Sequence, residues 1–113
     1  MSDFSLQEVK CVLTDPRGKQ VKFYAETWHN HIVKRHPEMS TRYDDVKQTV
    51  EDPDHIREGR KPETEELYVR ESAAGAVFVS TRDLDENSAT IVTSAYSGRD
   101  KASRGQVKWR KPQ

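Results

Sequence analysis

The spacing of apolar residues changes twice along this chain, and that change restricts the fold more than any other feature. Apolar and polar residues alternate up to Tyr24, as they do in half-buried strands. From Ala25 the apolar residues follow a helical spacing, and after Asp54 the alternation returns. The pattern predicts an α+β domain with an N-terminal β-hairpin, two helices, and then a four-stranded antiparallel meander sheet with the helices packed on one face.

The hairpin is predicted from two alternating segments and the turn between them. The strands are expected at Leu6–Leu13 and Gln20–Tyr24. They flank Asp15-Pro16-Arg17-Gly18, in which proline presets φ and glycine supplies a positive φ. Cys11 is the only cysteine and falls at an apolar position of the first strand, so we expect a buried residue that forms no internal disulfide.

Two helices are predicted between the hairpin and the sheet. The first runs from Ala25 to His36, because Pro37 disfavours the helical conformation for the residue before it. The second begins with Ser40 or Thr41 as its N-cap and ends before Pro53. The residues expected to face the core are Trp28, Ile32, Tyr43, Val46 and Val50.

Four short strands follow, separated by clusters of turn-forming residues. They are predicted at His55–Arg57, Glu66–Arg70, Ala76–Arg82 and Ala89–Tyr96. Because the connections are short, the strands should pair antiparallel with their sequence neighbours.

Charge and length divide the chain into a domain and a tail. Residues 1–98 hold 13 basic and 18 acidic groups, and residues 99–113 hold six basic groups and one acidic group. We expect 1–98 to form a single α+β domain and 99–113 a basic C-terminal tail.

The small number of apolar residues limits the size of the core. Only 21 of the 113 residues are Leu, Ile, Val or Phe, so we expect a thin core, and a homodimer is one possible way to complete it. No apolar run approaches the roughly 18 residues of a membrane span and no signal-peptide segment is recognised, so we expect a cytoplasmic protein with no membrane partner.

Titratable side chains are densest in the first predicted helix. His31 and Arg35 are neighbours at i and i+4 beside the core stripe, and His36 lies at the helix C-terminus, where the dipole favours a cation. An imidazole at such a border can contact a ligand and still titrate near neutrality, as general acid–base catalysis requires. The alternative is that both histidines are half-buried residues that cap carbonyl groups. His29 and His31 point about 200° apart on a helix, so we expect no metal and no other cofactor.

The last predicted strand carries a second set of polar groups. Alternation places Thr90, Val92, Ser94 and Tyr96 on one face and Ile91, Thr93 and Ala95 on the other. The hydroxyl groups either are satisfied within the sheet or are available to a ligand. Arg70 and Arg82, on neighbouring strands, either line the same sheet face or are ordinary solvated charges.

Four short segments of this sequence occur in a characteristic order. They are Trp-x-x-His-Ile-x-x-Arg-His-Pro-Glu (28–38), Glu-Asp-Pro-Asp-x-Ile (51–56), Tyr68, and Ile-Val-Thr-Ser-Ala-Tyr (91–96). Together, over roughly residues 24–98, they resemble the phage-associated branch of the barnase–EndoU–colicin–RelE-like superfamily of small ribonucleases and toxins. The resemblance implies helices followed by a four-stranded antiparallel sheet, and a cleft between helix and sheet that cleaves RNA without a metal.

The resemblance also implies the site residues of a toxin- or phage-type endoribonuclease. At matching positions the catalytic residues are His31, Arg35 and His36 from the helix and Thr93 and Tyr96 from the last strand. The implied reaction is transesterification by the ribose 2′-OH. In it His31 acts as base or acid, Arg35 clamps the phosphate, Thr93 donates a hydrogen bond to a non-bridging oxygen, and His36 is a second proton carrier.

RNA contacts are expected from the tail and from the sheet. The basic candidates for phosphate contacts are Arg70, Arg99, Lys101, Arg104 and Lys108, and Trp109 is the candidate for stacking on a base. A tail that only keeps the protein in solution is the alternative.

Two other functions stay open at this point. The chain is either a non-catalytic module of the same fold that recognises RNA or a protein partner, or an immunity-like acidic protein that masks a basic toxin. The acidic residues of that second alternative are Asp44, Asp45, Glu51, Asp52 and Asp54. For a toxin, the expected partners are RNA and an immunity or antitoxin protein.

Overall fold

The computed structural model describes residues 9–73, 75–84, 89–98 and 105–112, which form an α+β structure. The strands are β1 (Val9–Thr14), β2 (Gln20–Tyr24), β3 (His55–Glu58), β4 (Glu65–Arg70), β5 (Ala76–Asp83), β6 (Thr90–Gly98) and β7 (Val107–Arg110). The helical segments are η1 (Thr27–Val33), η2 (Pro37–Met39) and α2 (Tyr43–Glu51). None of the helices within these ranges is long and apolar enough to cross a membrane.

The strands form one mixed sheet of seven in the order β1-β2-β6-β5-β4-β3-β7. The α+β class is confirmed, and β3 to β6 pair antiparallel as the expected meander. The expected four-stranded sheet is too small, because the hairpin joins the meander through a parallel contact between β2 and β6 and β7 adds to β3. β7 is not predicted from the sequence, and its four residues alternate between half-buried and exposed positions in a basic segment.

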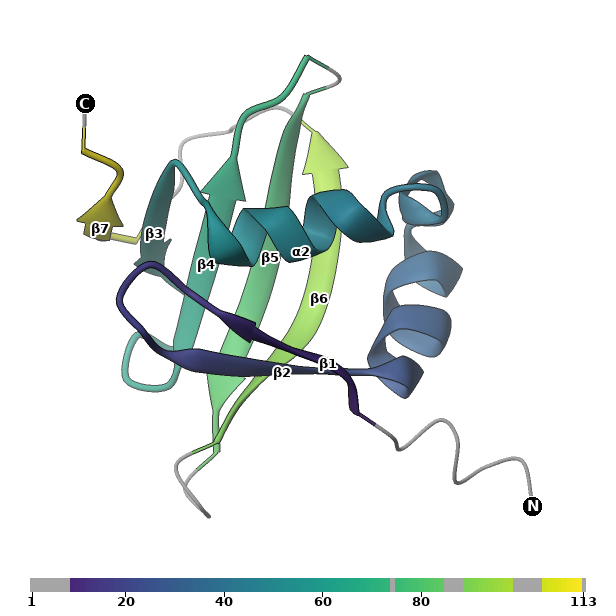
Figure 1. Cartoon of the computed structure of the whole chain (residues 1–113), viewed down its shortest axis with the longest axis horizontal. Helices are drawn as coiled ribbons and strands as arrows, with labels where there is room; N and C mark the ends of the chain where they lie inside the picture. The colour runs from purple at the N-terminus through teal and green to yellow at the C-terminus, as the bar shows by residue number, and fades with distance from the viewer. Residues whose placement is uncertain (1–8, 74, 85–88, 99–104, 113) are drawn as a thin grey trace.

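The core lies on one face of this sheet. In Figure 1, α2 and the β1–β2 hairpin cross the same face of β3–β6, and η1 lies beside β6. The buried cluster there contains residues from the hairpin, the helical segments and the sheet: Leu13, Val21, Phe23, Trp28, Ile32, Met39, Val46, Val50, Ile56, Tyr68, Val77, Val79, Val92 and Ala95. A smaller cluster of Val69, Ala76 and Phe78 is built, within the described part of the chain, from strand residues alone.

The helical segments differ in detail from the expected pair. η1 is a π-helix, and its Trp28 and Ile32 are buried as the apolar stripe predicts. The second helix was expected to begin at Ser40 or Thr41, and this prediction is wrong because Arg42 is the N-cap of α2 and makes no side-chain capping bond. The intervening residues instead form the single 3-10 turn η2, with Pro37 at its start. Proline is suited to this position because its missing N–H is not needed in a first turn.

The hairpin turn has the predicted geometry. The Gly18 N–H donates to the Asp15 carbonyl oxygen at 2.9 Å, and Gly18 has φ of 90°. The Asp15 carboxylate accepts hydrogen bonds from the Arg17 backbone N–H (2.8 Å) and from the Tyr68 hydroxyl on β4 (2.8 Å). Arg17 reaches onward to Glu66, also on β4, with Nη2–Oε1 at 2.7 Å and Nη1–Oε2 at 3.0 Å. The turn is thus attached to the middle of the sheet.

Glu66 is the centre of this network because three cations surround its buried carboxylate. Lys19 Nζ and Lys108 Nζ lie 3.4 and 2.6 Å from its oxygens, in addition to Arg17. Burial raises the pKa of Glu66, but hydrogen bonds from Arg17 and Lys108 and the charges of Arg17 and Lys19 outweigh burial and lower the pKa to about 2. The pKa of Asp15 is also lowered, because burial is outweighed there by hydrogen bonds from Arg17, Tyr68 and the turn backbone.

We predict that Glu66→Gln removes part of the acid sensitivity of folding. Because the pKa of Glu66 is lower in the folded state than in the unfolded state, its ionised form stabilises the protein at pH values above the usual glutamate pKa. This stabilisation is lost as pH falls from about 4.5 towards 2. The shift corresponds to roughly 3 kcal/mol at neutral pH. Urea unfolding at pH 7, 4.5 and 2.5 should therefore show a less stable variant at pH 7 and a smaller loss on acidification.

The matched control for this prediction is Glu63→Gln, since Glu63 is an exposed residue near the start of the same strand. It should unfold like the wild type at each pH. Equal acid dependence of the free energy of unfolding in wild type and Glu66→Gln would contradict the role given to the network.

Candidate functional site

A cleft of about 560 Å³ lies where β2 leaves the sheet. β2 pairs with β6 at Lys22 and Ile91, and the chain then turns into the helix that contains η1. The residues that line the cleft come from this junction and from the neighbouring strands: Tyr24, Glu26, Thr27, His31, Arg82, Ile91, Val92 and Thr93. The cleft therefore lies between helix and sheet.

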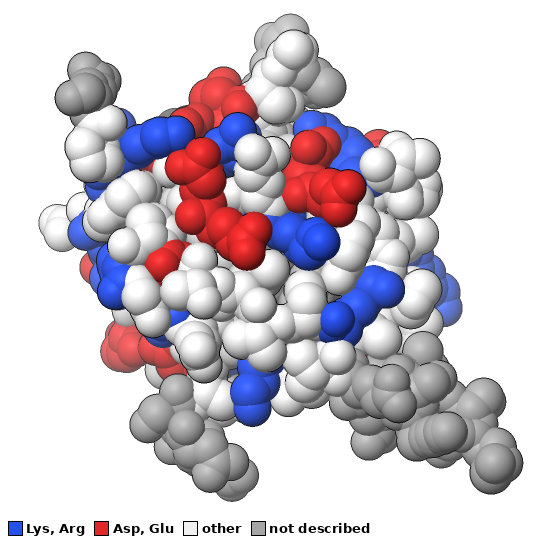
Figure 2. All heavy atoms as spheres, in the orientation of Figure 1, with Lys and Arg blue, Asp and Glu red and all other residues white. Residues whose placement is uncertain are grey.

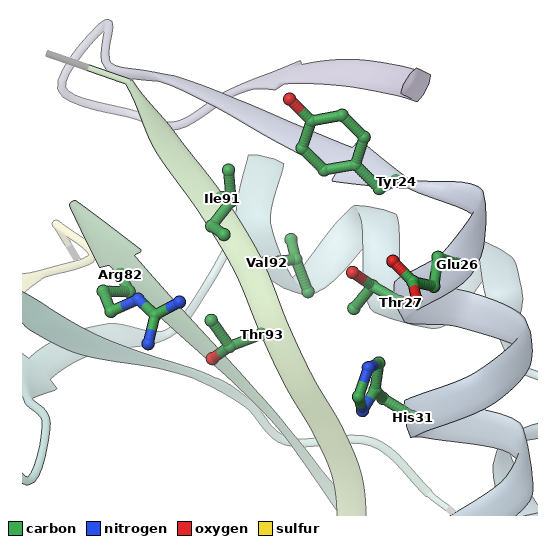
Figure 3. Close-up of a pocket in the computed structure, with 8 residues that line it drawn as sticks. All are labelled: Tyr24, Glu26, Thr27, His31, Arg82, Ile91, Val92 and Thr93. Atoms are coloured by element: carbon green, nitrogen blue, oxygen red, sulfur yellow. The ribbon is translucent and has the colours of Figure 1, made fainter. Parts of the chain in front are cut away.

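The helical side of the cleft presents a carboxylate, a hydroxyl and an imidazole. Glu26, Thr27 and His31 project from the helix towards β6 in Figure 3. Hydrogen bonds of a π-helix join residues five apart, so Glu26 lies roughly one turn before His31. Trp28 and Ile32 are buried at 7 % and 0 % exposure, and they fix which face of the helix remains for the cleft.

The sheet side of the cleft depends on a β-bulge in β6. Ser80 pairs with Ser94 and Thr81 pairs with Val92, so Thr93 is the extra residue between them. The bulge breaks the predicted alternation: Val92 and Ala95 both belong to the main core, although strict alternation places them on opposite faces. Thr93 is released towards the cleft, and its Oγ1 donates to the Ser80 carbonyl oxygen at 3.1 Å.

Arg82 adds a guanidinium group to the same cleft. It is an exposed residue of β5, and Figure 3 shows its side chain directed towards Thr93, on the other side of β6 from His31. Glu26, His31 and Arg82 form no salt bridge with any other residue that the structure describes. Within the described part of the chain, these three side chains are therefore not tied into the fold by an ion pair.

A metal site is not seen at this cleft or elsewhere in the described ranges. Among those residues, no three His, Cys, Asp or Glu side chains lie close enough together to hold a metal ion. The chemistry that these groups allow is proton transfer by Glu26 and His31 and anion binding by Arg82.

The predicted catalytic residues separate into two places. His31 and Thr93 line the cleft together, whereas Arg35, His36 and Tyr96 do not line it. Arg35 is an exposed residue two positions after η1 ends at Val33, and its side chain is not part of the lining. His36 has already left the helix, with φ of −130° and ψ of 75°, and its ring lies 5.7 Å from the ring of Tyr96.

The predicted RNA-binding residues that the structure describes are engaged within the protein. Arg70 Nη1 donates to the Asp52 carbonyl oxygen at 2.7 Å, at the end of α2. Lys108 pairs with Glu66, and Trp109 packs against the main core as a half-buried side chain of β7. Arg99, Lys101 and Arg104 lie outside the described residues.

Glu26 was missed as a site residue, and Arg82 was considered only as a residue of the sheet face. Glu26 was missed because α-helical spacing does not align it with His31, and a π-helix leaves no clear signal in sequence. Arg82 follows Phe78 and Ser80 at alternating positions of β5. Strand periodicity therefore predicts which face of the sheet Arg82 lies on, but it does not predict that Arg82 lines a cleft.

The chain was compared with family models, with curated proteins and with solved structures. None of the three comparisons found a match.

We predict that Thr93→Val destabilises the fold by about 1 kcal/mol, because the substitution keeps the β-branched shape and removes the hydrogen bond to Ser80. Thr93→Ser keeps the hydroxyl and should recover most of the free energy of unfolding. Urea denaturation of the three proteins measures the difference. A valine variant as stable as the wild type would show that the hydroxyl does not anchor the bulge.

Proposed function

We propose that this chain is a small metal-independent endoribonuclease that cleaves RNA at the cleft by 2′-OH transesterification. The observation that supports this proposal is the presence of one carboxylate, one imidazole and one guanidinium, from Glu26, His31 and Arg82, around a single cleft. Transesterification needs a general base, a general acid and a cation that stabilises the charged phosphorane. The three side chains supply one group for each role.

The proposed steps follow from the chemistry of these groups. Glu26 accepts the proton of the ribose 2′-OH, and the 2′-oxygen attacks the adjacent phosphorus. The bond from phosphorus to the 5′-oxygen breaks, and protonated His31 donates its proton to that leaving oxygen. The products are a 2′,3′-cyclic phosphate and a free 5′-hydroxyl group. Arg82 binds non-bridging oxygens with its planar pair of N–H donors.

Three roles in this proposal differ from those implied by the resemblance. Glu26 replaces His36 as the second proton carrier, because Glu26 lines the cleft and His36 does not. Arg82 replaces Arg35 as the phosphate clamp, because Arg82 lines the cleft and Arg35 does not. Thr93 has its proton engaged by Ser80, so its oxygen is an acceptor for a substrate hydroxyl rather than a donor to phosphate.

The immunity-like alternative has less support from the surface charges. Figure 2 shows acidic and basic side chains side by side on the face that carries α2. Asp45 pairs with Arg42 at 2.8 Å, and Asp52 pairs with Lys111 and Arg70 at 3.1 Å each. Acidic groups neutralised in this way offer a weaker field to a basic toxin. A non-catalytic RNA-binding module would use the same cleft, and the following experiment separates it from the enzyme.

We predict that His31→Gln lowers the rate of RNA cleavage by at least about 100-fold, since a positioned acid or base contributes 10² to 10⁴. The assay incubates mixed RNA with protein in EDTA and measures products that end in 2′,3′-cyclic phosphate. Wild type should give a bell-shaped pH profile, and His31→Gln should lose one limb. The control is His29→Gln, because His29 is an exposed residue of the same helical segment that does not line the cleft. If wild type binds RNA but does not cleave it, the proposed ribonuclease activity is refuted and the non-catalytic RNA-binding module is supported.

We predict that Arg82→Ala lowers kcat by about 10² to 10³, because it removes the cation that stabilises transition-state charge. Arg35→Ala is the matched control, since Arg35 is also an exposed arginine and lies outside the cleft lining. It should change kcat by less than about threefold. Single-turnover cleavage in EDTA measures both variants. If Arg35→Ala lowered kcat more than Arg82→Ala, Arg35 rather than Arg82 would be the residue that binds the phosphate.

A further inference from the structure

Two aromatic rings stack on the strands that carry the cleft, and a third ring lies tilted against them. Phe78 and Tyr96 lie with ring centroids 5.0 Å apart and 14° between their planes. His36 lies against Tyr96 at 5.7 Å with 37° between the planes. Phe78 is only 4 % exposed, whereas 35 % of the His36 side chain is exposed. His36 is therefore a partly exposed ring against a pair that is anchored in the second buried cluster, and its Nδ1 lies 3.8 Å from Glu38 Oε2.

The backbone holds His36 in place before any ligand binds. Its N–H donates to the Ile32 carbonyl oxygen at 2.7 Å, and its carbonyl oxygen accepts from the Met39 N–H at 2.8 Å. Pro37 follows it directly and starts η2. A ring fixed by its neighbours loses little conformational entropy when a second ring stacks on it, so binding there costs little ordering.

The stack lies on the same side of the sheet as Arg82, the guanidinium group of the cleft. Phe78 and Arg82 occupy positions i and i+4 of β5, which face the same way in a strand. Along β6, Tyr96 follows Thr93 by three residues, or roughly 10 Å at the usual rise per residue. A chain bound with one phosphate in the cleft would bring a neighbouring nucleotide to the stack.

We propose that His36, supported by Tyr96, is a base-stacking subsite for a nucleotide next to the cleaved phosphate, and that the substrate is single-stranded RNA. This inference rests on the proposed function, and it makes His36 a binding residue rather than a second proton carrier. Stacking on an aromatic ring accepts every base, because every base has a π face. It requires an unpaired strand, since bases within a duplex are already stacked on each other.

The test uses a DNA oligonucleotide that contains one ribonucleotide as its only cleavable position. The base on either side of the cleaved bond is kept or replaced by an abasic residue. For wild type, removal of the base on one side should raise KM about tenfold, as expected for the loss of one stacked base. His36→Ala should show the same rise with the intact oligonucleotide and almost no further rise with the abasic one. His36→Phe should restore the preference for the intact oligonucleotide, with kcat and the pH profile unchanged.

The controls separate this subsite from the proposed catalysis. His29→Ala should behave like wild type, because His29 is exposed on the neighbouring helix and is not part of the stack. Fluorescence anisotropy with the all-DNA oligonucleotide, which cannot be cleaved, measures binding alone. If no protein cleaves but His36→Ala binds this oligonucleotide about tenfold more weakly than wild type and His36→Phe, the catalytic proposal fails and the subsite stands.

Three results would overturn the subsite. The first is a wild type that binds or cleaves intact and abasic oligonucleotides equally well. The second is a His36→Ala variant with an unchanged KM and unchanged anisotropy. The third is a His36→Phe variant as impaired as His36→Ala with one limb of the pH profile missing, which would show that His36 carries a proton.

Discussion

The buried charge network around Glu66 is the interaction on which the placement of the cleft depends. The hairpin contacts the rest of the sheet through a short parallel pairing between β2 and β6, which by itself would leave its far end unsupported. Arg17 joins that end to Glu66, and the Tyr68 hydroxyl donates to Asp15. With both ends of the hairpin fixed, the direction in which β2 enters the helix is fixed too. Removing the Glu66 carboxylate and its three cations from water costs free energy, and the hydrogen bonds that they form with one another offset that cost.

Two local irregularities then turn a regular helix–sheet contact into a site. The bulge in β6 brings Val92 and Ala95 into the core and turns Thr93 outward, so one strand serves the core and the cleft at the same time. The π-helical winding of η1 keeps Trp28 and Ile32 buried while it brings Glu26 and His31 to one side. Both irregularities are frequent next to functional sites, because they re-aim single side chains without changing the elements that carry them.

The periodic parts of the fold could be predicted from the sequence, and the irregular parts could not. Alternation and the Asp15–Gly18 turn predicted the hairpin, and the order of strands predicted the meander, because local propensity and tertiary packing agree there. His31 and Thr93 were both predicted, and both line the cleft. Helical spacing predicts Arg35 as the phosphate-binding partner of that pair, but the guanidinium that lines the cleft belongs to Arg82 of β5, a residue far away in the chain. β7 escaped prediction because its pairing with β3 is made by residues far apart in the chain, a contact that no local pattern records.

Strongly shifted pKa values often mark active sites, but the lowered pKa values of Glu66 and Asp15 belong to the folding network. Glu66 and Asp15 are ionised, buried and surrounded by donors, so they hold their protons too weakly to exchange them near neutrality. Glu26, His31 and Arg82 have no salt bridge among the described residues and line an open cleft. A group that transfers protons must be accessible to its substrate and must change charge at little cost to the fold. The charges that attach the hairpin to the sheet are therefore separate from the groups that line the cleft.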